Sequence, residues 1–192
     1  SGNIWMMKDE NDDANFEELM NNDIAEGDSF PALFISCTTL KDPVSFNGRY
    51  HNFEVVTYVN YDKLQEFNGL EDYHNEAYVV FKQKVINKLM NNMEKIIPNA
   101  KQYIVQAELG TPKTNEFYIN STRGNVYGTE KTLNQVGPFS YKNKTEIENL
   151  YLCGASTLSH GVGGATHSGL AAAAAILNCH KDDLLVEDEH QK

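Results

Sequence analysis

The residues best suited by type and spacing to hold a ligand lie near the end of the chain, at positions 149–177. A short apolar run at residues 150–153 ends at Gly154 and is typical of a buried parallel strand. Gly161, Gly163 and Gly164 then form a glycine-rich turn, and a helix of small residues is predicted from about residue 165 to 178. Missing side chains let a ligand approach the backbone, and N–H groups at a helix start attract negative charge. The pattern therefore predicts a site for an anionic or polar cofactor edge.

The position of this unit indicates that it closes a nucleotide-binding fold rather than opening one. The dinucleotide fingerprint G-x-G-x-x-G opens its domain, and further strands and helices follow it. Here only a short acidic stretch follows the helix, and Thr166 stands where the third glycine would be. An ordinary strand and helix packed through alanines is the structural alternative.

Other chemistries fit these residues poorly. Ser156 lacks the second glycine of the G-x-S-x-G turn that serine hydrolases use. His160 and His167 have no acidic or cysteine partner nearby, so no metal site is predicted. We expect His167 to be partly buried on the first turn of the helix, with a place near the cofactor edge as the functional alternative. No catalytic residue can be assigned, because no Asp, Glu and His cluster is placed for acid–base work.

Composition excludes several classes of partner. The net charge of −11 argues against binding to nucleic acid and to anionic membrane surfaces. No stretch approaches the eighteen apolar residues of a transmembrane helix. Cys37, Cys153 and Cys179 are far apart and are predicted to be free thiols in a reducing compartment, with Cys153 buried in the strand.

The first 110 residues predict an α+β layer after an acidic start. Residues 1–29 are expected to be an acidic linker or a short helix. Strands are predicted at residues 32–37, 53–59 and 103–109, and a long helix at 72–97 ends before Pro98. The helix carries an apolar stripe of Ala77, Phe81, Val85, Leu89 and Met93. Residues 30–110 are therefore expected to form a sheet-based region with one long helix.

The remaining residues are expected to lead back to the cofactor fold. Thr111 is a predicted N-cap with Pro112 at the first helical position, and a short helix would run to about Tyr118. Glycines at 124 and 128 punctuate an extended loop. Residues 111–180 thus form the third predicted segment, and residues 181–192 an acidic tail.

Five blocks together resemble the C-terminal half of phytoene desaturase-like flavoproteins, most closely the all-trans-retinol saturases and carotenoid isomerases. The blocks are FPALFIS at residues 30–36, KDP at 41–43, GTPKTNEFY at 110–118, RGNVYG at 123–128 and LYLCGAST at 150–157. The resemblance covers about residues 30–178 and depends on the order and spacing of the blocks.

The resemblance implies an FAD-dependent oxidoreductase that acts on carbon–carbon double bonds of an isoprenoid polyene, as a saturase, desaturase or isomerase. It implies an α/β fold, in which a split Rossmann-type FAD domain carries an inserted substrate region. No G-x-G-x-x-G occurs and the chain begins Ser1-Gly2, so a C-terminal fragment is expected. Such a fragment would be inactive alone and would not bind FAD tightly.

The implied site combines the glycine-rich unit with aromatic side chains. The residues expected to bind FAD are Gly154, Ala155, Ser156, Gly163, Gly164, Ala165 and Thr166. Phe117, Tyr118 and Tyr127 would line an apolar substrate tunnel, with core packing as the alternative. Two departures from the family pattern are Ala155, where an acidic residue is common, and the absence of a proline between Leu158 and Gly161.

The expected partner is a hydrophobic small molecule, and the expected location is cytoplasmic or peripheral to a membrane. Two alternatives remain on the same architecture. One is a flavin-free binding protein for prenylated partners, similar to GDP-dissociation inhibitors. The other is a flavin oxidase of the amine-oxidase type.

Overall fold

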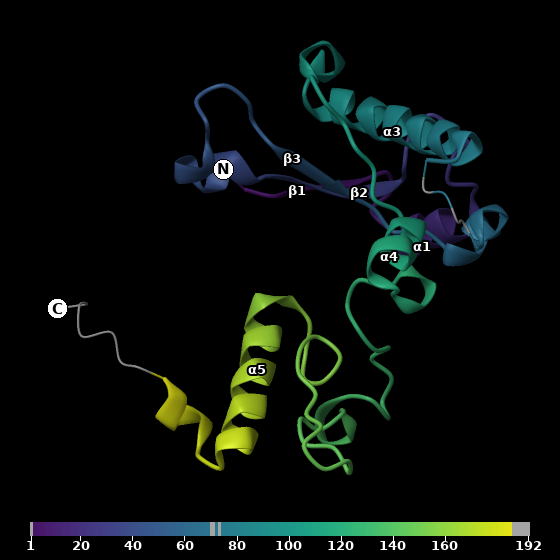
Figure 1. Ribbon diagram of the computed structural model, residues 1–192. Coiled ribbons are helices and arrows are strands. Elements are labelled where there is room, and N and C mark those ends of the chain that lie inside the picture. The colour runs from purple at the N-terminus through teal and green to yellow at the C-terminus, as the bar shows by residue number, and fades with distance from the viewer. Residues whose placement is uncertain (1, 70–71, 73, 186–192) are drawn as a thin grey trace. The chain divides into compact units, whose positions relative to one another are not determined.

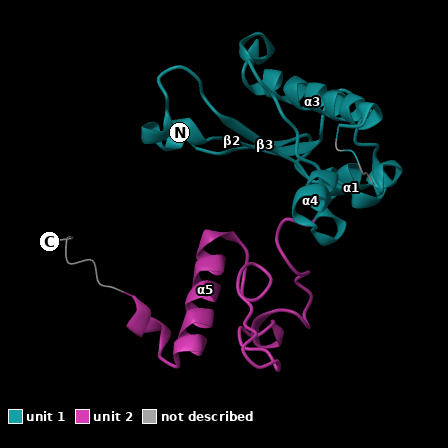
Figure 2. Ribbon diagram, viewed as in Figure 1, with its two compact units in different colours: residues 1–124 teal, residues 125–192 magenta. Residues whose placement is uncertain are grey.

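The computed structural model describes residues 2–69, 72 and 74–185 and divides the chain into two compact units (Figure 1). Unit 1 comprises residues 1–124 and unit 2 residues 125–192 (Figure 2). Helices and a small sheet occur together, as an α/β prediction requires. The described part of the predicted acidic tail is a short 3-10 helix at Lys181–Leu184, while residues 186–192 lie outside the described part.

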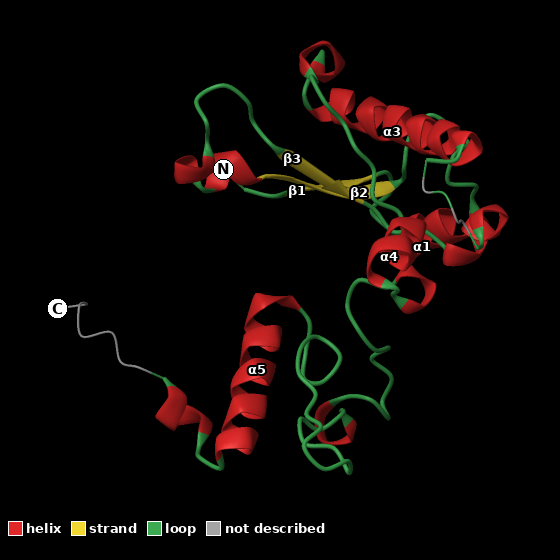
Figure 3. Cartoon of the chain, in the orientation of Figure 1, coloured by secondary structure: helices red, strands yellow, loops and turns green. Residues whose placement is uncertain are grey.

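Unit 1 contains a three-stranded antiparallel sheet in the order β1-β2-β3 (Figure 3). The strands are β1 (Ile4–Met7), β2 (Ala32–Cys37) and β3 (Phe53–Val56). β2 and β3 confirm two predicted strands, although β3 ends before the predicted residue 59. β1 was not predicted, because its four residues are too few to reveal a period within an acidic segment.

The core of unit 1 lies between the sheet and helix α3 (Glu76–Ile96). Leu33 and Ile35 of β2 are buried in the same cluster as Phe81 and Val85 of α3. The predicted stripe of α3 is confirmed from Phe81 onward, whereas Ala77 in the first turn is exposed. Burial of this stripe contributes to the hydrophobic stabilisation of unit 1, together with the other residues of the cluster.

The acidic start of the chain is tied to this core. Helix α1 (Asp12–Asn21) lies within the segment for which a linker or short helix is expected. Asn92 of α3 is fully buried; its side chain accepts a hydrogen bond from Phe30 N (2.8 Å) and donates one to Phe30 O (2.9 Å). Lys88 also donates to the carbonyls of Ile24 (3.3 Å) and Glu26 (2.5 Å). Helix α3 therefore fixes the chain that enters β2.

The predicted strand at residues 103–109 is wrong. The chain forms a 3-10 helix at Ala100–Tyr103 and then runs without regular structure, and Tyr103 and Val105 are exposed. Alternation of apolar and polar residues makes a strand only where a neighbouring strand offers its edge. No strand of the described residues pairs with this segment.

The remaining elements are short, apart from the helix of unit 2. They are α2 (Thr38–Lys41), α4 (Pro112–Ile119), α5 (Gly161–Leu177) and 3-10 helices at Pro43–Ser45, Tyr61–Phe67, Thr122–Gly124 and Gly137–Phe139. Across the described residues, no helix combines the length and apolar character needed to cross a membrane.

Candidate cofactor and substrate site

Helix α5 begins at Gly161, four residues before the predicted start. Gly161, Gly163 and Gly164 therefore lie in the first turn of the helix, and the prediction that they form a turn before it is wrong. His160 occupies the N-cap position, but its side chain accepts no hydrogen bond from the amides of the first turn. The amides of a first helical turn have no partners within the helix, so the start of α5 keeps N–H groups for another acceptor.

The predicted strand at residues 150–153 is not formed in this chain. This segment forms only an isolated antiparallel bridge between Lys144 and Tyr151. Leu150 and Leu152 are 43% and 38% exposed, and Cys153 is exposed rather than buried. The residue pattern of a buried strand is present, but the described part of unit 2 has no sheet to receive it.

A buried hydroxyl joins the loop at residues 154–160 to α5. Ser168 is fully buried, and its Oγ accepts a hydrogen bond from Gly154 N (2.9 Å) and shares one with Thr157 Oγ1. Asn143 Nδ2 donates to Ser168 O (3.0 Å) and to Leu152 O (2.9 Å). We call Asn143, Gly154, Thr157 and Ser168 the serine node. A serine within an alanine-rich helix is the only sequence signal for it, and sequence reasoning missed it.

Gly164 allows the helix to approach the loop closely. A Cβ atom there would lie 2.4 Å from Ser159 O and 2.6 Å from Ser159 C, which are backbone atoms. At Gly163 the same atom would meet nothing within 4 Å. The two adjacent glycines therefore differ, because only Gly164 is required by packing within the chain.

The other predicted site residues are accessible. Of the expected FAD-binding residues, Ser156, Gly163 and Thr166 are exposed, while Gly154, Ala155, Gly164 and Ala165 are half-buried. His167 is exposed, so the expectation of partial burial is wrong.

All three residues predicted to line the tunnel are exposed; two lie in unit 1 and one lies in unit 2. Phe117 and Tyr118 lie on α4 in unit 1, with ring centroids 5.0 Å apart. Tyr127 lies in unit 2, and its ring is 4.6 Å from that of His160. Core packing, the alternative to the tunnel, does not describe these exposed side chains.

The predicted start of α4 is confirmed. Thr111 Oγ1 accepts hydrogen bonds from Lys113 N (3.0 Å) and Thr114 N (3.4 Å), and Thr114 Oγ1 accepts one from Thr111 N (2.8 Å). This reciprocal capping box satisfies amides that the helix leaves free. Tyr78 of α3 adds a hydrogen bond between its hydroxyl and Thr111 Oγ1 (2.6 Å).

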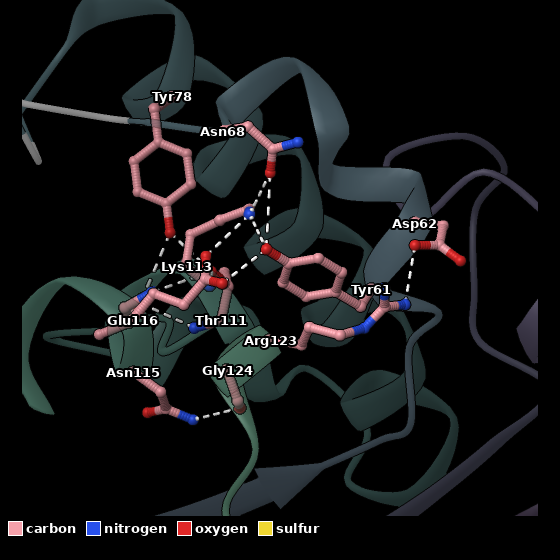
Figure 4. A network of polar contacts seen from close by, with 11 residues as sticks. Tyr61, Asp62, Asn68, Tyr78, Thr111, Lys113, Asn115, Glu116, Arg123 and Gly124 are labelled. Atoms are coloured by element: carbon pink, nitrogen blue, oxygen red, sulfur yellow. Dashed lines mark hydrogen bonds and ion pairs between the residues drawn. The ribbon is translucent and has the colours of Figure 1, made fainter. Parts of the chain in front are cut away.

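A buried lysine fixes α4 to the 3-10 helix at Tyr61–Phe67 (Figure 4). The Lys113 side chain is only 3% exposed, and its ammonium donates to Tyr61 Oη (2.6 Å), Asn68 Oδ1 (2.6 Å) and Glu116 Oε2 (2.8 Å). Tyr61 in turn donates to Glu116 Oε1 (2.5 Å). We call Tyr61, Asn68, Lys113 and Glu116 the lysine cluster. Sequence reasoning missed it, because its members come from segments about 50 residues apart.

The lysine cluster keeps both charges. Burial works against the charge on Lys113, but hydrogen bonds and charge interactions with Glu116 and Tyr61 together outweigh it and raise the pKa of Lys113. Burial also works against the charge on Glu116, yet hydrogen bonds from Lys113 and Tyr61 and the charges of Lys113 and Arg123 lower the pKa of Glu116. These groups are occupied with one another, so the cluster is suited to holding α4 in place rather than to exchanging protons with a substrate.

Comparison with known proteins assigns the chain to a family. The family model described as flavin containing amine oxidoreductase matches residues 26–177. The chain belongs to this family. The match covers both units and includes β2, α3, α4 and α5.

The similar proteins confirm the resemblance to phytoene desaturase-like flavoproteins. The chain is 28% identical over 155 residues to all-trans-retinol 13,14-reductase of Danio rerio, covering 77% of this chain and 25% of that protein. It is 29% identical over 150 residues to prolycopene isomerase 1, chloroplastic, of an Oncidium hybrid cultivar, covering 75% and 24%. It is 24% identical over 144 residues to 4,4'-diaponeurosporene oxygenase of Staphylococcus haemolyticus, covering 74% and 26%. The chain thus spans about a quarter of the length of these relatives, and no solved structure matches it.

The contact at Gly164 predicts different effects for substitutions at Gly164 and Gly163. Gly164→Ala should lower the free energy of opening of the loop and first helical turn by about 1–3 kcal/mol, because its methyl group collides with Ser159. Gly163→Ala, the matched control, should leave it unchanged or raise it by up to about 1 kcal/mol. Amide hydrogen exchange of residues 154–177 measures both values. Equal effects of the two substitutions would show that the close approach is not needed.

The lysine cluster predicts a stability contribution with two pH limits. Lys113→Met should lower the free energy of unfolding of unit 1 by about 1–3 kcal/mol near neutral pH. The contribution of Glu116 should disappear as pH falls through its lowered pKa, below its ordinary value of 4.5. That of Lys113 should disappear as pH rises through its raised pKa, above its ordinary value of 10.5.

Urea unfolding at a series of pH values measures this difference. Lys101→Met is the control, because Lys101 forms a more exposed pair with Glu94 (3.2 Å) and should contribute less than about 1 kcal/mol. A stability difference for Lys113→Met that stays constant from acid to alkaline pH would contradict the assignment.

Proposed function

We propose that this chain is the C-terminal part of an FAD-dependent oxidoreductase that acts on carbon–carbon double bonds of an isoprenoid polyene. The observation that carries the proposal is the family match, together with relatives named as a retinol reductase, a prolycopene isomerase and a diaponeurosporene oxygenase. These names concern retinoids and carotenoids, which are all conjugated isoprenoids.

Unit 2 is proposed to close a split Rossmann-type FAD domain. Among its described residues, the only buried apolar side chains are Ala172 and Ala174. Leu150, Leu152, Ile176 and Leu177 are exposed, which is unusual for an isolated folded unit. A parallel sheet that accepts residues 150–153 as a strand and is covered by α5 would bury these side chains. The chain matches only about a quarter of the length of its relatives, and the unmatched part of those proteins could supply such a sheet.

The residues at the start of α5 fit a flavin. The first turn of α5 offers amide donors without a capping side chain, and Gly161, Val162 and Gly163 leave it exposed. In the proposal, Gly154, Ala155, Ser156, Gly163, Ala165 and Thr166 hold the cofactor, while Gly164 joins the helix to the loop. FAD supplies the redox chemistry when it is bound, and the positive end of the helix favours negative charge on its ring.

The charges of unit 1 favour an apolar substrate. Arg123 donates to Asp62 Oδ1 (2.8 Å), and Arg49 lies over the Tyr50 ring, 4.8 Å from its centre. The buried charges of the lysine cluster are paired with each other. Since a small acid or amine needs a free charged partner, the exposed aromatic side chains of Phe117 and Tyr118 on α4 are the better candidates for substrate contact. Tyr127, which is exposed in unit 2, is a separate candidate.

An amine is the second candidate substrate, because the family description names amine oxidoreductases. A flavin-free binding protein is not favoured, since the relatives considered are named for a reductase, an isomerase and an oxygenase.

The test uses the flavoprotein that carries this chain. We expect it to purify with bound FAD, and we expect its flavin to change redox state with a retinoid or a carotenoid under anaerobic conditions. A primary amine and a hydroxy acid, tested on the same preparation, should have no effect. If only the amine reduced the flavin, an amine would replace the polyene as the proposed substrate. A protein that purifies without FAD and does not take up added FAD would contradict both proposals.

A further inference from the structure

We propose that residues 127–131 form a clamp that positions the loop at residues 154–160, and that Gly128 is the positioning residue at its centre. The proposal extends the proposed function and relies on it for the identity of the cofactor. The clamp begins with Tyr127 and Gly128, the last two residues of the RGNVYG block. The proposed FAD site and substrate contacts give a role only to Tyr127 of this block.

Three side chains of the clamp contact the loop. The Tyr127 ring lies 4.6 Å from the His160 ring, at an interplanar angle of 39°. Thr129 Oγ1 donates to Ser156 O (3.2 Å), and Lys131 Nζ makes a long contact with Ala155 O (3.5 Å). The clamp therefore contacts the loop near its start and at the residue directly before α5.

Gly128 brings the two backbones together. Its φ angle of +81° lies in the region that favours glycine. A Cβ atom there would lie 2.9 Å from both Ser156 N and Ser156 Oγ, so an alanine would push the loop away. Gly137 in the same unit has a similar φ of +59°, but a Cβ atom on it would meet nothing within 4 Å.

The clamp and the serine node hold the same loop through different residues. The serine node contacts Gly154 and Thr157, whereas the clamp contacts Ala155, Ser156 and His160. Because the loop leads directly into the first turn of α5, its position determines where the free amides of that turn point. Gly128 therefore acts on the cofactor through the loop and need not touch it.

The first test measures the contact between the clamp and the loop and needs no cofactor. The first measurement is the NMR chemical shift of the His160 ring protons, whose signals are assigned by their loss in His160→Gln. The ring current of Tyr127 shifts these signals, since the two rings lie 4.6 Å apart. Tyr127→Leu gives the chemical shift without this ring current. In the full chain, Gly128→Ala should move these resonances toward the Tyr127→Leu position, while Gly137→Ala, which adds the same methyl group at positive φ, should leave them in place. Thr129→Val removes the hydrogen bond to Ser156 O at nearly constant side-chain volume and should move the His160 resonances in the same direction. This variant provides the test if Gly128→Ala does not fold.

The second test measures the reduction potential of the bound flavin. In the flavoprotein that carries this chain, Gly128→Ala should shift the reduction potential of the bound flavin, and Gly137→Ala should not. His160 resonances that stay in place in Gly128→Ala and Thr129→Val would overturn the clamp. A moved resonance with an unchanged flavin potential would overturn the positioning role. Failure of the wild-type protein to bind flavin would overturn the proposed function and this role with it, while the resonances would still decide whether the clamp exists.

Discussion

The buried hydroxyl of Ser168 is the contact on which the candidate site depends. Its oxygen accepts a hydrogen bond from the Gly154 amide and shares one with the Thr157 hydroxyl. These bonds fix the loop at residues 154–160 to the helix that follows it. A buried hydroxyl without partners would be costly, and here two of its partners, Gly154 and Thr157, belong to the loop and a third is the Asn143 amide. The close approach at Gly164 and the contacts of residues 127–131 act on the same loop. Together they place a helix start with free amides at a defined position.

The two units are stabilised by different means. Unit 1 has a conventional core between β2 and α3, and buried polar side chains such as Asn92 and Lys113 join separate segments to it. Unit 2 contains the serine node and buries only two apolar side chains, Ala172 and Ala174, among its described residues. Polar contacts of this kind specify one geometry but supply little of the driving force for folding. This difference supports the proposal that a further sheet covers unit 2 in the flavoprotein proposed above.

Most predictions from local chemistry succeeded, and several predictions that needed a distant partner did not. The N-cap at Thr111 and the apolar stripe of α3 from Phe81 onward follow from residues a few positions apart, and both were predicted. Residues 150–153 and 103–109 have strand-like patterns but no neighbouring strand, and pairing is a property of the whole fold rather than of the segment. The early start of α5 was missed because glycine disfavours helices, and only the contact with Ser159 shows why Gly164 is needed. The lysine cluster escaped detection because Tyr61 and Lys113 come together only in the folded chain. The family resemblance was recognisable because it rested on the order of several blocks.

The most direct test of the central claim compares amide hydrogen exchange in the flavin-loaded and flavin-stripped forms of the protein that carries this chain. If the loop and the start of α5 hold the cofactor, exchange at residues 154–166 should be slower in the loaded form, while exchange in α3 should stay the same. Equal exchange at residues 154–166 in the two forms, with flavin binding verified in the same samples, would contradict the assignment of this segment to the flavin.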